Sequence, residues 1–191
     1  MNKISQMLLL SLGLLVAGSA QAAEATLQKL LSFKPGDTEA QVEALFGAEA
    51  KRQAGDREAP FSMPDRGKVR NDYYRIDQVY IDGLAFSASF LASPDGKLGG
   101  VQLDRAYYAE KNQTVPSDNE AQAEYDRTQS AVEAIVGTPK QSTKRLLGGG
   151  FGLSHRSLWD TPIAEYAVVT IFSKNKSWWI TVISNLKTPA N

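Results

Sequence analysis

The chain has 191 residues, its 21 Lys and Arg balance its 21 Asp and Glu, and it contains one histidine and no cysteine. The balanced charge argues against nucleic acid as the main partner, because a phosphate-binding surface needs clustered Lys and Arg. The composition also excludes disulfides, a cysteine-ligated metal and a His-rich metal site, so we expect no metal and no other cofactor.

The N-terminus has the layout of a secretory signal peptide. Lys3 gives it a positive charge, residues 7–17 form an apolar run, and residues 20–22 (Ala-Gln-Ala) form a small-x-small cleavage site. The apolar run is shorter than the roughly 20 residues that span a bilayer, so we expect cleavage after Ala22 and no membrane anchor. Since no cysteine is present for lipid attachment, we expect a soluble protein in the bacterial periplasm or outside the cell.

Two later segments predict the same element, a helix that ends at a glycine. Residues 38–47 place apolar side chains at i, i+3 and i+4 and end at Gly47, which tolerates the left-handed backbone of a helix end. Residues 128–137 are identical to the first segment at half of their positions and end at Gly137. Pro139 then prevents the helix from resuming. The second helix is expected to begin near Asp118.

Strand-like sequence follows each glycine. These segments are residues 74–81, 84–90 and 98–104 in the first half, and 167–172 and 178–183 in the second. The order of helix, glycine, strand, hairpin and strand thus occurs twice. It predicts an α+β fold of two tandem helix–antiparallel-sheet repeats, residues 23–110 and 111–191, which can join into one continuous sheet with helices on one face.

Alternation along the strands predicts which side chains face the helices. In the first repeat these are Leu84, Phe86, Ala88, Phe90, Val101 and Leu103. In the second repeat, Val169, Ile171, Ile180 and Val182 are preferred, although that repeat is apolar on both faces. The opposite face then carries Ser87, Ser89, Gln102, Asp104, Tyr166, Val168, Thr170, Trp179 and Thr181.

The helix segment from Lys34 to Gly47 resembles one found in two related groups of proteins. One is the small lipoprotein of the outer-membrane β-barrel assembly machine, and the other is the secreted β-lactamase inhibitory protein. The second copy, which ends Val136-Gly137-Thr138-Pro139, is similar to the same segment and matches its Gly-x-Pro ending. The resemblance implies a tandem helix-on-sheet fold whose known members bind other proteins through the sheet and do not catalyse reactions.

The residues give little support for an enzyme. His155, Ser157 and Asp160 contain the groups of a hydrolytic triad, but they lie close together in sequence, whereas triads are assembled across a fold. We therefore expect His155 to be a polar loop residue. The glycine-rich residues 148–152 lack the Gly-Lys-Ser/Thr of a phosphate loop and predict a hairpin tip.

Aromatic residues provide the candidate binding surface. Trp178 and Trp179 are adjacent in a strand, so their side chains point to opposite faces and one of them lies outside the core. Exposed tyrosine and tryptophan dominate protein-binding surfaces because they give large contact area with a polar group. The predicted partner-binding residues are Tyr74, Tyr80, Trp159, Tyr166 and Trp179. The alternative is that these aromatic residues are buried between the repeats.

Three functions are consistent with these features. The leading hypothesis is an exported protein-binding module, such as an inhibitor, an immunity protein or an accessory to envelope assembly, with a protein partner in the envelope or outside. The second is a carrier of a small ligand or lipid, with a cavity between helices and sheet. The third is a hydrolase that uses His155.

Overall fold

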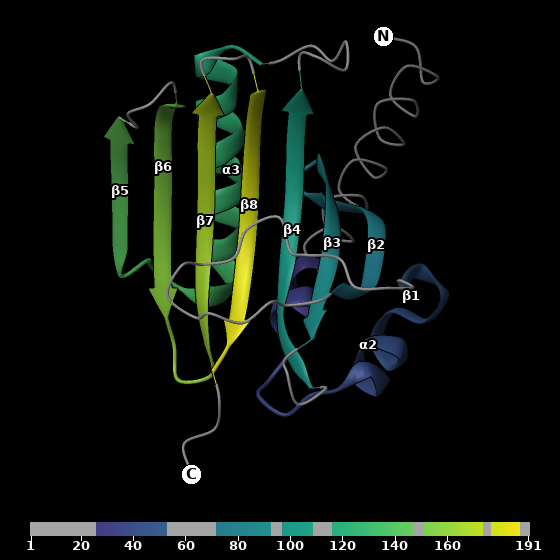
Figure 1. Ribbon diagram of the computed structural model, residues 1–191. Helices are drawn as coiled ribbons and strands as arrows, with labels where there is room; N and C mark the ends of the chain where they lie inside the picture. Colours follow the sequence, from purple (N-terminus) through teal and green to yellow (C-terminus); the bar gives the residue numbers. More distant parts are fainter. Residues whose placement is uncertain are drawn as a thin grey trace, which may run out of the picture.

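The computed structural model contains one antiparallel sheet of eight strands in its described part (Figure 1), which comprises residues 26–52, 72–92, 97–108, 116–146, 151–173 and 177–187. The strands are β1 (Lys51–Arg52), β2 (Asp72–Ile81), β3 (Leu84–Ala92), β4 (Leu98–Tyr108), β5 (Gln141–Leu146), β6 (Phe151–Asp160), β7 (Ala164–Ser173) and β8 (Ser177–Leu186). The fold is therefore mixed α+β, as expected, with sheet as its larger part. The expected signal peptide lies outside the described residues.

The strand order shows how the two halves of the chain meet. Strands β1 to β4 are neighbours in chain order, and so are β5 to β8. In the second set, β5 lies at the outer edge of the sheet and β8 lies next to β4. The sheet order is β1-β2-β3-β4-β8-β7-β6-β5. The last strand of each set is therefore paired at the centre, where Leu103 of β4 lies opposite Val182 of β8. This pairing makes the sheet continuous.

Helices α2 (Glu39–Phe46) and α3 (Asp118–Val136) begin and end as their sequences predict. Ser117 accepts a hydrogen bond from the Glu120 amide, which caps the start of α3. Gly47 and Gly137 follow the two helices with φ angles of 50° and 93°, a backbone that glycine adopts without steric cost. A short 3-10 helix, η1 (Gly47–Glu49), follows α2. No described helix is long and apolar enough to cross a membrane.

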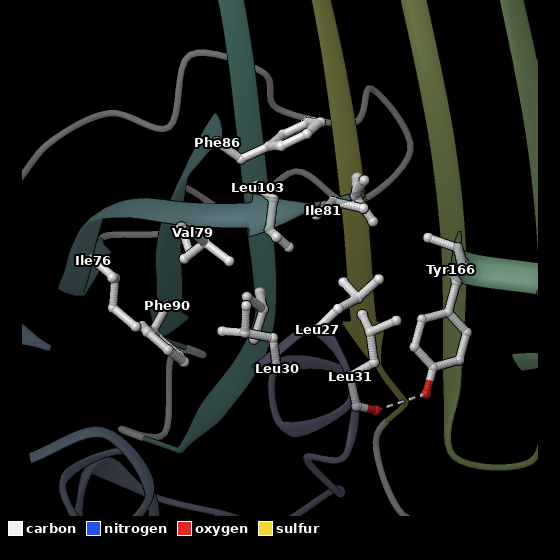
Figure 2. Close-up of a cluster of buried hydrophobic side chains, with 14 of the residues drawn as sticks. Leu27, Leu30, Leu31, Ile76, Val79, Ile81, Phe86, Phe90, Leu103 and Tyr166 are labelled. Carbon is white, nitrogen blue, oxygen red and sulfur yellow. Dashed lines mark hydrogen bonds between the residues drawn. The ribbon is translucent and has the colours of Figure 1, made fainter. Parts of the chain in front are cut away.

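Residues 26–31 form a further helical segment, which was not expected from the sequence. Its side chains at Leu27, Leu30 and Leu31 are buried against the sheet. Figure 2 shows them beside Val79, Phe90 and Leu103, with the Tyr166 hydroxyl directed at the Leu31 carbonyl. This segment therefore completes the core over the centre of the sheet.

The helices cover one face of the sheet. A row of directly opposed residues on neighbouring strands identifies this face. Phe90, Val101, Ser184, Tyr166 and Trp159 are paired in turn across β3, β4, β8, β7 and β6. Rings of Phe33 and Phe46 pack on Phe90 with centroids 5.7 and 5.5 Å away. At the far side, Trp159 donates a hydrogen bond to the carbonyl of Gly137, just after α3. The row therefore lies under the helices.

The predicted faces are correct for β3, β4 and β8 and wrong for β7. All six side chains predicted to face the helices in the first half are buried, as are Ile180 and Val182. Val168 lies opposite Val182, so Tyr166, Val168 and Thr170 face the helices, whereas Val169 and Ile171 lie on the other face. Because β7 is apolar at both parities, its alternation carries no signal, and its pairing with β8 decides the face.

Candidate functional site

The face of the sheet opposite the helices carries partly exposed apolar side chains, and no described helix covers it. The register places Ser154, Ile171, Trp179 and Ala106 in one row of directly opposed residues, and Leu158, Ala167, Ile183 and Gln102 in another. We call the partly exposed apolar members of this face, together with Val169 between the two rows, the apolar patch: Leu158, Val169, Ile171, Trp179 and Ile183.

The structure divides the five predicted partner-binding aromatics between the two faces. Tyr80 is exposed and lies opposite Ala85 on the helix-free face, and Trp179 belongs to the apolar patch. Tyr74, Trp159 and Tyr166 are 3%, 3% and 4% exposed on the helix-covered face. The expectation that Tyr166 shares a face with Trp179 is therefore wrong.

The three buried aromatics each attach a helical segment to the sheet. Tyr74 donates hydrogen bonds to the carboxylates of Glu39 and Glu43 in α2, and these acceptors raise the pKa of its phenol. Trp159 fixes the end of α3 as described above, and Tyr166 donates to the carbonyl of Leu31 over 3.3 Å. The sequence predicted these three residues as partner-binding, whereas their polar atoms form hydrogen bonds with the helical segments that cover the core.

Strands β3 and β4 part before either strand ends, and this opening is the second feature of the helix-free face. Their pairing runs from Ala92–Leu98 to Ser87–Asp104. Beyond it, residues 84–86 of β3 continue in register with β2, while residues 105–108 of β4 continue in register with β8. In Figure 1, β4 extends past β3 at this end of the sheet. We call this opening the β3–β4 cleft.

The cleft has a volume of about 640 Å³. Its lining residues come from β2, β3 and β4: Asp77, Gln78, Ala85, Phe86, Ser87, Asp104, Arg105, Ala106 and Tyr107. Ala106 also lies directly opposite Trp179, so the cleft adjoins the apolar patch. A concave site with a few converging polar groups is the usual form of a binding site.

Arg105 forms the helix-side wall of the cleft. Its Nη1 donates to the carbonyl of Ala85 over 3.0 Å, and its Nε donates to Glu124 of α3 over 2.9 Å. The guanidinium also stacks 4.9 Å from the centre of the Tyr107 ring. Burial alone lowers the pKa of Arg105, but the hydrogen bonds and charge of Glu124 outweigh it and raise the pKa. A permanently charged side chain therefore links β4, β3 and α3.

The two carboxylates of the cleft are held by side chains around them. Asp104 accepts hydrogen bonds from Gln102 and Thr181, both at 2.8 Å. Asp77 lies 2.5 Å from the ammonium of Lys51, and this hydrogen bond lowers the pKa of Asp77. Both residues thus present oriented oxygen acceptors. No described group of His, Cys, Asp and Glu has the arrangement of a metal site.

The proposed hydrolytic set is not assembled. His155 lies in β6 and is 7% exposed on the helix-covered face, so the expectation of a loop histidine is wrong. Ser157 on the same face forms hydrogen bonds with the hydroxyl of Tyr125 and the amide oxygen of Gln129. Asp160 lies on the opposite face with Lys140 and Lys187. Residues 148–150 of the glycine cluster lie outside the described residues.

The cleft was not predicted, because the strand was expected to end at Asp104. The strand continues through Arg105, Ala106 and Tyr107. Tyr107 and Tyr108 favour a strand and were the available signal, although the alternation of polar and apolar residues breaks at the adjacent charges of Asp104 and Arg105. The parting of β3 from β4 has no such signal, since it depends on which neighbour each strand keeps.

No protein-family model matches the sequence, and the searches of curated proteins and of solved structures gave no match. The resemblance of the helix segments to the β-lactamase inhibitory protein and the assembly lipoprotein stays a prediction.

Proposed function

We propose that this protein is an exported, soluble protein-binding module of the inhibitor, immunity or envelope-accessory type. The binding surface consists of the apolar patch and the adjoining β3–β4 cleft. The observation that carries this proposal is the row of Ile171, Trp179 and Ala106 on a sheet face that no described helix covers. Contiguous apolar surface rimmed by polar groups is typical of protein-binding sites.

The surroundings of the patch support a protein partner. Arg156 is an exposed charged neighbour in β6, and Asp160 and Glu165 are exposed at the ends of β6 and β7. Charged residues around an apolar centre steer association and fix the orientation of a partner. An extended sheet also presents a rigid surface, so little conformational entropy is lost when a partner binds.

The two-repeat organisation, residues 23–110 and 111–191, belongs to the same proposal. Each half contains a helix that ends at a glycine with positive φ, followed by four strands in meander order. Strands β4 and β8, the last strands of the two halves, are paired with each other, which supports a duplication of one unit. The β3–β4 cleft lies in the first half of the chain and the apolar patch in the second half, so the proposed binding surface uses both halves.

A site-specific photo-crosslinker tests the surface. Placed at Ile171 in the envelope of the producing cell, it should yield a covalent product with one protein, and Trp179→Ala should reduce that product strongly. Leu45 is 39% exposed on α2 and provides the control, because the same crosslinker there should give no such product. Equal products from positions 171 and 45, or no effect of Trp179→Ala, would contradict this binding surface.

A small-ligand carrier is the second candidate, and the size of the cleft favours it. Its volume of about 640 Å³ lies within the roughly 300–1,000 Å³ of small-molecule sites. The cleft opens within the sheet, however, whereas the carrier hypothesis expected a cavity between helices and sheet. Native mass spectrometry of protein purified from the producing cell would show a bound molecule if this alternative is correct.

A further inference from the structure

We propose that the β3–β4 cleft binds an extended segment of the partner protein, which adds as a strand along the inner edge of β4. This inference rests on the proposed protein-binding function and specifies how the partner is held. The segment would pair with Arg105, Ala106 and Tyr107, where no residue of β3 stands opposite in the register of the described strands. Strand addition supplies affinity through main-chain hydrogen bonds.

At the cleft, the edges of β3 and β4 differ in whether a main-chain acceptor already has a hydrogen-bond donor. Arg105 donates from its side chain to the carbonyl of Ala85, so a β3 acceptor that would face β4 already has its donor. Backbone polar groups that are buried need partners, and the remaining main-chain groups of a strand edge offer them to an added strand. The β4 edge is therefore the side of the cleft to which a segment would bind.

The shape of the cleft also suits a main chain. Ala85, Ser87 and Ala106 line it with small side chains, which leave room for another backbone. Four residues, 105–108, continue β4 beyond its last pair with β3, and a strand rises about 3.3 Å per residue. A segment of three or four residues thus fits along this edge, with small or apolar side chains beside Ala106.

The side from which the partner segment would enter follows from the residues that close the cleft. Arg105 and Glu124, which are 17% and 16% exposed, close the side toward α3. The segment would therefore reach β4 from the helix-free face, where Trp179 lies directly opposite Ala106. The rest of the partner then covers the apolar patch, so that one partner uses both features.

The outer edge at β5 is a weaker place for strand addition. Lys144 and Arg145 are exposed along this strand. Charged side chains on an outer edge, lysine above all, are the usual protection against the addition of another strand. The cleft contains no lysine among its lining residues.

Selection of random displayed peptides against the full chain tests the inference. Selected peptides should bind the wild-type protein and should bind at least about tenfold more weakly to Ala85→Leu, which fills the cleft. Ala92→Leu is the matched control, because Ala92 is a partly exposed alanine on the same strand where β3 and β4 are still paired. The Ala92→Leu variant should bind the selected peptides with the same affinity as the wild type.

Hydrogen exchange on the wild-type protein gives a second measurement that needs no variant. A bound peptide should slow amide exchange at residues 105–107. Peptides that bind without slowing exchange there, or whose affinity Ala85→Leu leaves unchanged, would overturn strand addition. If exchange slows at residues 169–171 and 179–183 instead, the proposed function stands and this inference fails. Slowed exchange at 105–107 on self-association, without peptide, would also overturn it, because the occupant would be a second copy.

Discussion

The ion pair of Arg105 and Glu124 should contribute measurably to stability, unlike the more exposed ion pairs among the described residues. Two hydrogen bonds of 2.9 and 3.2 Å join the guanidinium to the two carboxylate oxygens, and both side chains are less than one-fifth exposed. Removal of one partner of a fully buried pair costs about 3–5 kcal/mol, because the other charge is left in the interior. Partial hydration lowers this cost, so we expect a loss of about 2 kcal/mol in the free energy of unfolding for Glu124→Ala.

A double-mutant cycle isolates the interaction. The free energy of unfolding is measured by urea denaturation for the wild type, Glu124→Ala, Arg105→Met and the double variant. We expect a coupling energy of about 1.5 kcal/mol, within the range for residues in direct contact. The coupling should persist in high salt, since partly buried pairs are screened less than exposed ones.

Lys140 and Asp160 provide the control pair. Their charged atoms are 3.0 Å apart, but their side chains are 72% and 41% exposed. Exposed pairs contribute about 0.2–1 kcal/mol and weaken with salt, so the Lys140→Met and Asp160→Ala cycle should give a smaller, salt-sensitive coupling. Equal coupling in the two cycles, or less than about 0.5 kcal/mol for Arg105 and Glu124, would refute the assignment of Arg105 as a link between β4 and α3.

Three further predictions follow from burial and close contact. Leu30→Ala removes a fully buried side chain and should lower the free energy of unfolding, measured by urea denaturation, by about 2–5 kcal/mol. Leu45→Ala removes an exposed side chain and should change it by less than about 0.5 kcal/mol. Similar losses for the two variants would mean that residues 26–31 do not pack on the sheet. Gly100→Ala should prevent proper pairing of β4 with β8, because the added Cβ would lie 2.1 Å from the carbonyl oxygen of Ser184, and an unchanged melting temperature would contradict this packing. Burial lowers the pKa of His155, so the unfolded chain binds a proton at this histidine more readily than the folded chain does. The free energy of unfolding should therefore fall as the pH drops below the ordinary histidine pKa of about 6.5, and it should level off below the pKa of the folded state. His155→Gln should reduce this dependence between pH 7.5 and 5, and an identical pH profile for the variant would count against a buried neutral imidazole.

The sequence by itself determined the local elements of this protein. Capping residues and glycines fixed both ends of α3 and the end of α2, because those preferences act within a few residues of the chain. Strict alternation fixed the buried face of β3, where Phe86, Ala88 and Phe90 are separated by serines. These signals are local, so they survive without knowledge of any neighbour.

Tertiary structure decided what depends on neighbouring strands. The face of β7 follows from the pairing of Val168 with Val182, because the sequence of β7 is apolar at both parities. Tyr74, Trp159 and Tyr166 became attachments for helices once the sheet placed them under those helices. The cleft exists because β4 keeps β8 as its neighbour after β3 has left it, and such a choice between partners far apart in sequence has no local signature.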